Sequence, residues 1–156
     1  MGAVMQIQID SREHQSERKR IEAQFDELGI QHFCSKLYVG DYMNLDNPRV
    51  VVDRKQGLLE VCGNVTQQHE RFRAELVRAR KTGIKLIVLV EEPGIRSLED
   101  VFFWQNPRRK TSPKATNGEQ LFRSMQTMCE RYGVQFEFCN KRQTGRRIKE
   151  LLEIVT

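Results

Sequence analysis

Three charged residues, Asp53, Arg54 and Lys55, follow directly after the apolar, β-branched run of residues 50–52. That run is predicted to form a buried strand, and charged groups at the end of a buried strand need water, ionic partners or a metal ion. Side chains two residues apart in a strand share a face, so Asp53 and Lys55 are expected to lie together, with Arg54 on the opposite face. A carboxylate in such a place can hold a divalent cation, and an ammonium can hold a water molecule or a phosphate group.

Two further acidic positions come earlier in the chain. The sequence Val-Gly-Asp-Tyr at residues 39–42 predicts a turn, in which Gly40 permits backbone angles that other residues resist and leaves Asp41 facing an open site. Asp10 and Glu13 follow an alternating apolar and polar stretch, residues 4–9, that predicts a strand with one buried face. If these strands pair, both carboxylates lie at a neighbouring strand end.

Carboxylates beside a lysine suit the hydrolysis of a phosphodiester bond. That reaction needs an activated water, neutralisation of charge on the phosphate and help for the leaving oxygen, and a magnesium ion held by a few carboxylates can serve all three needs. Asp41 and Asp53 are the first-choice ligands, and Glu13 and Asp10 are the second choice. Lys55 is expected to orient or activate the attacking water, or to neutralise the phosphate.

These three segments together resemble the XPF-type nuclease domain of the PD-(D/E)XK, restriction-endonuclease-like group. The family pattern is an apolar strand ending in D-x-R-E, then V-G-D-[YF], then an apolar strand ending in E-R-K. The chain has the three blocks in that order, at residues 9–13, 39–42 and 53–55. It departs from the pattern twice: Asp53 replaces the usual Glu, and Leu59, with Glu60 beside it, stands where the family often has Asp.

The resemblance implies a metal-dependent DNA endonuclease that uses Mg²⁺ or Mn²⁺ and cuts branched, flapped or forked DNA near a junction by one-step hydrolysis. Larger members of the family carry a helix-hairpin-helix domain and act as dimers. This chain is expected to lack that domain and to draw its substrate choice from the nuclease domain, from a homodimer formed through its last two helices, or from an accessory DNA-binding protein. Two alternatives stay open: an inactive DNA-binding relative of the same fold, and a restriction-type enzyme that cuts plain duplex.

Basic residues supply the candidate DNA contacts. The chain has a formal net charge of +5 and a pI of about 9.2, which is compatible with nucleic acid. Arg54 either forms a structural ion pair or reaches DNA from the rim of the site, and it is included among the catalytic candidates. Contacts to phosphates would be independent of base sequence. The candidates for them, each of which also suits an ordinary solvated face, are Arg12, Arg71, Arg108, Arg109, Lys110, Arg146 and Arg147.

Composition predicts one domain over residues 1–156, with a mobile basic loop at 105–117. No apolar run is long enough to span a bilayer, and the first residues do not resemble a signal peptide. A cytoplasmic location is therefore expected, and the host cytoplasm if a bacteriophage encodes the chain, as its small size suggests. The four cysteines are scattered, which disfavours a zinc site.

The order of predicted elements gives the fold class. Helices alternate with strands, and the run at 84–90 is apolar throughout, which is typical of a central parallel strand. The sequence therefore predicts an α/β, restriction-endonuclease-like fold with a mixed β-sheet flanked by helices. The predicted strands are 4–9, 30–39 with a continuation at 42–45, 50–53, 84–90 and 134–139. Asn47-Pro48 predicts a turn, and two short strands joined by a turn suggest an antiparallel pair. The predicted helices are 14–28, 66–81 with the apolar stripe Phe72, Leu76 and Ala79, 97–104, one that follows the capping-box pattern Thr116-x-x-Glu119 and ends at Tyr132, and 144–155.

Overall fold

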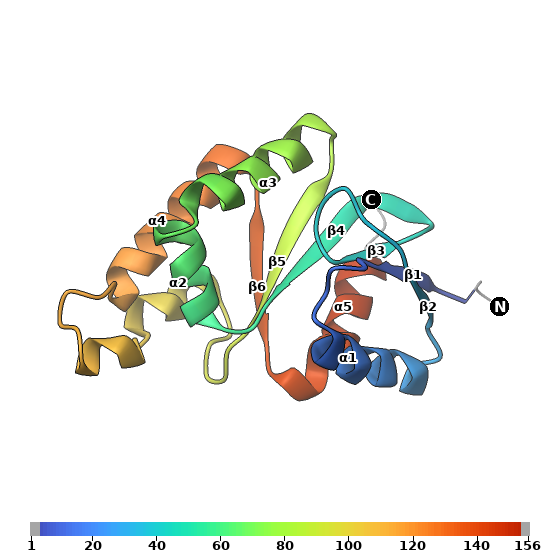
Figure 1. Cartoon of the computed structure of the whole chain (residues 1–156), viewed down its shortest axis with the longest axis horizontal. Helices are drawn as coiled ribbons and strands as arrows, with labels where there is room; N and C mark the ends of the chain where they lie inside the picture. Colours follow the sequence, from blue (N-terminus) through green and yellow to red (C-terminus); the bar gives the residue numbers. More distant parts are fainter. Residues whose placement is uncertain (1–3, 154–156) are drawn as a thin grey trace.

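The computed structural model of the chain describes residues 4–153 and has three layers, a mixed six-stranded sheet between two layers of helices (Figure 1). The predicted fold class is confirmed. The order of strands across the sheet is β2-β1-β3-β4-β5-β6. Their bounds are β1 (Gln6–Ile9), β2 (Gln31–Cys34), β3 (Tyr42–Asn44), β4 (Asn47–Lys55), β5 (Lys85–Glu91) and β6 (Gln135–Cys139).

Helices cover both faces of this sheet. In Figure 1, α2, α3 and α4 lie on one side of it, and α1 and α5 lie on the other. The α-helices are α1 (Gln15–Glu27), α2 (Leu58–Thr66), α3 (His69–Lys81), α4 (Gly118–Tyr132) and α5 (Thr144–Glu153). Short 3₁₀ helices are η1 (Leu98–Phe103), η2 (Pro107–Lys110) and η3 (Lys141–Gln143).

The sheet joins an antiparallel part to a parallel part at β4. Strand β3 is antiparallel to both β1 and β4, as the turn between the predicted second and third strands suggested. Strands β4, β5 and β6 are parallel, and β5 is buried as predicted, although it lies next to the edge strand β6 and not at the centre of the sheet. Because parallel strands end at the same edge, Lys55 and Glu91 come close to one another there. In open α/β sheets that edge is the usual place of a ligand site.

Two hydrophobic clusters hold the layers together, one on each face of the sheet. The first includes the predicted stripe of α3, Phe72, Leu76 and Ala79, packed against β4, β5 and α4. The second packs Phe25 of α1 and Ile148 of α5 against β1 and β5. The rigid layers fix the positions of the strand ends and of α3, which border the site described below.

Two local predictions were wrong by one or two residues. Asn47-Pro48 suggested a turn, but the turn occupies residues 45–46 and Pro48 lies in β4. The pairing of β3 with β4 shifts register at Met43 and Asn44, so the missing N–H of proline is tolerated at this irregular strand start. The capping box of α4 uses Asn117 and Gln120 rather than the residues one position earlier.

The basic segment 105–117 contains η2 and several internal hydrogen bonds. The Asn106 side chain caps η2 and also donates to Thr116 O at 2.7 Å, while Arg109 donates to Ala115 O at 2.6 Å. The mobility of this segment stays a prediction. All four cysteines are free. No helix within residues 4–153 is long and apolar enough to cross a membrane.

Candidate active site

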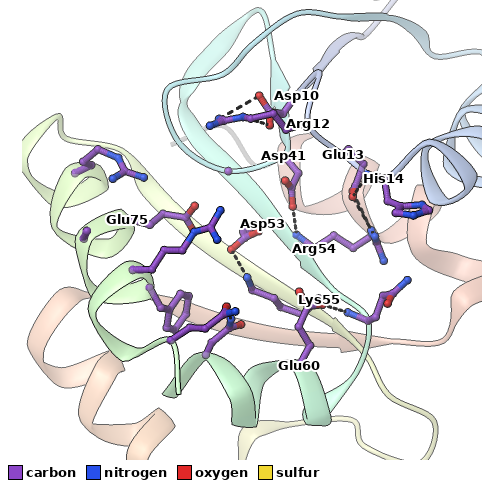
Figure 2. A pocket seen from close by; sticks show the side chains of 18 of the residues that line it. Asp10, Arg12, Glu13, His14, Asp41, Asp53, Arg54, Lys55, Glu60 and Glu75 are labelled. Atoms are coloured by element: carbon purple, nitrogen blue, oxygen red, sulfur yellow. Dashed lines mark hydrogen bonds and ion pairs between the residues drawn. The ribbon is translucent and has the colours of Figure 1, made fainter. Parts of the chain in front are cut away.

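A cavity of about 570 Å³ opens at the end of β4, between the β1 and β3 side of the sheet and helices α2 and α3 (Figure 2). All six residues predicted to be catalytic line it: Asp10, Glu13, Asp41, Asp53, Arg54 and Lys55. The structure therefore brings together side chains that are up to 45 positions apart in the sequence. The lining also includes polar residues that were not predicted as site residues, among them Gln56, Asn64, Glu75 and Arg78.

The turn before β3 holds Asp41 by its backbone. Its N–H donates to Val52 O at 2.9 Å and its carbonyl accepts from Asp10 N–H at 2.8 Å, so Asp41 bridges β4 and the end of β1. Gly40 has a φ of 73°, and a Cβ there would collide with Val51 and lie 3.2 Å from Val52 O. Both facts require glycine at this position. The Asp41 Oδ2 atom accepts the backbone N–H of Arg54 at 2.7 Å.

Asp53 and Lys55 share one face of β4, as the strand alternation predicted. The Lys55 Nζ atom lies 3.2 Å from Asp53 Oδ2 and 5.2 Å from the centre of the Phe72 ring. Burial alone would lower the pKa of Lys55, but the surrounding carboxylates, Asp53 foremost, outweigh it and raise that pKa above its ordinary value. Lys55 is therefore a stable ammonium, suited to holding a water molecule or a phosphate oxygen.

Asp41, Asp53 and Glu75 form the carboxylate cluster of the cavity. Asp53 is 5 % exposed, and Asp41 and Glu75 are each close enough to share a proton with it. Burial, followed by the charge of Asp53, raises the pKa of Asp41 well above its usual range and that of Glu75 to about 8. Burial also acts against ionisation of Asp53, but Lys55 outweighs it and lowers the Asp53 pKa. The cluster thus carries more carboxylates than one ammonium can neutralise.

Arg54 points away from that cluster. It belongs to a second group of hydrogen-bonded side chains, called the paired network, which consists of Glu13, Arg20, Arg54, Glu91 and Thr144. Its guanidinium donates to both oxygens of Glu13, at 2.9 and 3.0 Å, and to Glu91 Oε1 at 2.7 Å. The other Glu91 oxygen accepts from Arg20 at 2.7 Å and from the Thr144 hydroxyl. Burial acts to lower the pKa of Arg54, but Glu13 and Glu91 outweigh it and raise that pKa. Of the two interpretations of Arg54, a structural ion pair and a DNA contact from the rim of the site, the structure shows the ion pair.

Glu13 and Asp10 already have several donors each. Glu13 Oε2 also accepts from the Tyr42 hydroxyl at 2.8 Å, and Glu13 Oε1 from the His14 N–H at 3.1 Å. Asp10 accepts from Arg12 Nε at 2.9 Å and from the Leu37 N–H at 2.8 Å. These two carboxylates hold neighbouring parts of the chain in place, and their role as metal ligands stays a prediction.

The predicted DNA-contacting residues fall into two groups. Arg12 and Arg71 line the cavity from opposite sides, and Arg78, one helical repeat beyond Arg71 on α3, lines it as well. The shared helix face of Arg71 and Arg78 was visible in their seven-residue spacing. The other predicted contacts are not among the lining residues: Arg108, Arg109 and Lys110 in η2, and Arg146 and Arg147 in α5. Arg147 pairs with Glu137 and Glu150.

The second departure from the family pattern changes the outer part of the site. Leu59, at the position that is often acidic, is 43 % exposed on α2. Glu60 lines the cavity but its Oε1 accepts the Gln56 N–H at 2.7 Å. Glu75 is instead the additional carboxylate beside Asp53. Little in the sequence indicated this role, because a glutamate on an amphipathic helix usually lies on a solvated face.

The donor atoms of the cavity fit a divalent cation. Within residues 4–153, no three His, Cys, Asp or Glu side chains are already gathered as a ready-made metal site. Asp53 Oδ2 and Glu75 Oε1 are nonetheless buried without a hydrogen-bond donor. Carboxylate oxygens are the ligands that Mg²⁺ and Mn²⁺ prefer, and a cation here would offset the repulsion within the carboxylate cluster.

Comparison with known proteins agrees with the fold, and the family match spans all three sequence blocks. The ERCC4 domain matches residues 9–151, nearly the whole chain. The chain belongs to the ERCC4 domain family. This confirms the resemblance to the XPF-type nuclease domain that the three sequence blocks indicated.

Two solved structures of XPF from Aeropyrum pernix are similar to this ERCC4 domain. One is 20 % identical and the other, which is in complex with DNA, is 21 % identical, each with a TM-score of 0.68. The matches cover 94 % and 95 % of this chain but only 63 % of each XPF chain. At this identity the likeness establishes the fold. A comparison with curated proteins finds no match.

Proposed function

We propose that this ERCC4 domain is a DNA endonuclease that hydrolyses phosphodiester bonds with a divalent cation, Mg²⁺ or Mn²⁺. The observation that carries the proposal is the carboxylate cluster beside Lys55, at the strand end of a cavity that arginines border. Membership of the family and the DNA complex of the A. pernix XPF support it. The cavity thus combines acidic groups for a metal with basic groups for phosphates.

Asp41 and Asp53 are the proposed metal ligands. A bound cation would lower the pKa of a water molecule and neutralise negative charge on the phosphate. The chain itself orients Asp41 through the Arg54 backbone N–H and keeps Asp53 ionised through Lys55. Because Glu13 anchors the Arg54 side chain, we assign both residues to positioning Asp41.

Lys55 is proposed to hold the attacking water or a non-bridging phosphate oxygen as an ammonium. Its raised pKa makes it a poor proton acceptor, so its contribution is electrostatic rather than that of a general base. Its position against Asp53 and over Phe72 restricts its motion. Loss of its charge is therefore expected to lower the rate of cutting more than the affinity for DNA.

Branched, flapped or forked DNA is the proposed substrate. Arg12 and Arg71 would contact phosphates around the cavity, and the basic residues of η2 and α5 would contact more distant ones. Asp10 is assigned to holding Arg12 in place. A homodimer and an accessory DNA-binding protein remain predictions. Helices α4 and α5 lie on opposite faces of the sheet (Figure 1), so the last two helices do not form one continuous surface.

The test is cleavage of labelled flap, fork and plain duplex DNA by the purified protein, with Mg²⁺, with Mn²⁺ or with chelator. Wild-type protein is expected to cut the flap or fork only when metal is present. Asp41→Asn and Lys55→Ala should abolish cutting while DNA binding persists. Asp46→Asn and Lys36→Ala, at exposed positions outside the cavity, serve as matched controls and should cut at the wild-type rate.

The open alternatives give different results in the same assay. An inactive DNA-binding relative would bind branched DNA, leave every substrate intact with both metals and be indifferent to Asp41→Asn. A restriction-type enzyme would cut plain duplex at fixed positions. Either result would contradict the proposed function.

A further inference from the structure

Glu75 of α3 faces the carboxylate cluster from the wall of the cavity opposite the strand ends. Figure 2 shows its side chain reaching from the helix toward Asp53, whereas Asp41 reaches Asp53 from the sheet. Helix α3 is fixed against the sheet by Phe72 and Leu76, which lie three residues before and one residue after Glu75. The position of Glu75 is therefore set by the packing of the core and not by a flexible loop.

The oxygens in this part of the cavity lack donors. Glu75 Oε1 and Asp53 Oδ2 are both buried and accept no hydrogen bond, and the Asp53 side chain is 6 % exposed. Lys55 lies 3.2 Å from Asp53 Oδ2 and supplies one positive charge. A buried carboxylate oxygen without a donor is costly to fold around. Without a ligand, protons shared with Asp53 relieve this arrangement, and a bound cation can take the place of those protons.

From these contacts we propose that Glu75 is a third ligand of the divalent cation held by Asp41 and Asp53. The proposal rests on the metal-dependent function proposed above and extends it to a residue on a helix. It makes the cation a link between two layers of the fold, since Asp53 lies on β4, Asp41 in the turn before β3 and Glu75 on α3. Binding of the cation would then fix α3, with Arg71 and Arg78, relative to the strand ends.

The proposal can be tested without DNA, by titrating purified protein with Mn²⁺ and measuring the bound ion by electron paramagnetic resonance. Glu75→Gln keeps the size of the side chain and removes its charge. It is expected to weaken Mn²⁺ binding about tenfold or more, which corresponds to about 1.4 kcal/mol. Glu70→Gln, an exposed position on the first turn of the same helix, is the matched control and should bind as wild type.

A second measurement separates binding from folding. Mn²⁺ is expected to raise the melting temperature of wild type and of Glu70→Gln clearly, and that of Glu75→Gln much less. Glu75→Asp, which keeps the charge on a shorter side chain, should recover part of the Mn²⁺ affinity. Recovery of this kind would not follow from a purely structural role.

The outcomes distinguish this inference from the proposed function. If wild type cuts DNA with Mn²⁺ but Glu75→Gln binds Mn²⁺ as tightly as wild type, Glu75 is not a ligand although the nuclease stands. If Glu75→Gln loses Mn²⁺ affinity while wild type cuts no DNA, the metal site stands and the nuclease does not. If wild-type protein binds no Mn²⁺, the inference is overturned.

Discussion

The two faces of the end of β4 differ in how fully their charges are paired. On the Arg54 face, the paired network gives donors to Glu13 and Glu91 and acceptors to Arg54 and Arg20. On the Asp53 face, two buried carboxylate oxygens lack donors and the carboxylates repel one another. Both faces are built by consecutive residues of one strand. The paired network holds its side chains in fixed positions, whereas the carboxylate cluster has oxygens that can still bind a ligand.

The largest effect is expected from breaking the paired network. Arg54→Met would leave Glu13 and Glu91 buried without their shared cation, which costs about 3–5 kcal/mol. We expect the melting temperature to fall by roughly 10 °C. Arg49→Met, at an exposed position of the same strand, is the matched control and should change it little. Equal melting temperatures for Arg54→Met and wild type would show that the network does not stabilise the fold.

The opposite behaviour is expected on the other face. Asp53→Asn should slow DNA cutting by at least about 100-fold, or about 2.7 kcal/mol of transition-state stabilisation. Its melting temperature without metal should fall much less than that of Arg54→Met, because the lost ion pair with Lys55 is offset by relief of the repulsion that Asp53 exerts on Asp41 and Glu75. The measurements are single-turnover cleavage and thermal unfolding on the same preparation. If Asp53→Asn cuts slowly and also melts at as low a temperature as Arg54→Met, the two faces do not differ in the way described here.

A smaller effect concerns pH. Glu75 has a folded-state pKa of about 8 against an ordinary value of 4.5. Folded protein therefore retains a proton that unfolded protein loses, so the contribution of Glu75 to stability falls as pH rises from about 4.5 to about 8. Glu75→Gln, which does not titrate, should gain in metal-free stability relative to wild type across that window. The expected gain is about 1 kcal/mol, or roughly 2–4 °C in melting temperature. A difference that does not vary with pH would contradict this assignment.

The smallest effect is expected at the rim. Arg78→Ala should reduce DNA affinity a few-fold. It should also reduce the magnitude of the slope of log affinity against log salt concentration by about one, which is the contribution of one phosphate contact. Arg73→Ala, on the same helix but not among the cavity-lining residues, is the control. Binding curves at several salt concentrations measure both. An unchanged slope for Arg78→Ala would place the DNA elsewhere.

The sequence predicted those parts of the site that depend on local periodicity. Strand alternation placed Asp53 and Lys55 together and Arg54 opposite, because side chains in a strand must alternate. The turn with Gly40 was likewise readable, since its conformation excludes other residues. Apolar spacing predicted α1, α3, α4 and α5 to within a few residues but did not predict α2, and the capping box of α4 was missed by one position because Thr116 and Asn117 are both good caps.

Glu75 and the paired network could not be predicted in this way. Glu75 lies next to the apolar stripe of α3, and only the packing of α3 against the sheet turns it into the cavity. Glu91 ends a buried strand, yet its partners Arg54, Arg20 and Thr144 come from three other elements. Contacts between elements depend on strand order and crossing geometry, which periodicity does not encode.

The paired network also has a consequence for synthesis of the protein on the ribosome. Every cavity-lining residue lies between positions 10 and 78, so a nascent chain has all of them before β5 and α5 are made. Glu91 and Thr144, which complete the network around Arg54, emerge only later. A growing chain therefore cannot complete the network around Arg54 until β5 and then α5 have been translated. A chain that stops before residue 144 would lack the Thr144 hydrogen bond to Glu91 and the α5 side of the second hydrophobic cluster, and is expected to melt at a lower temperature than the full sequence.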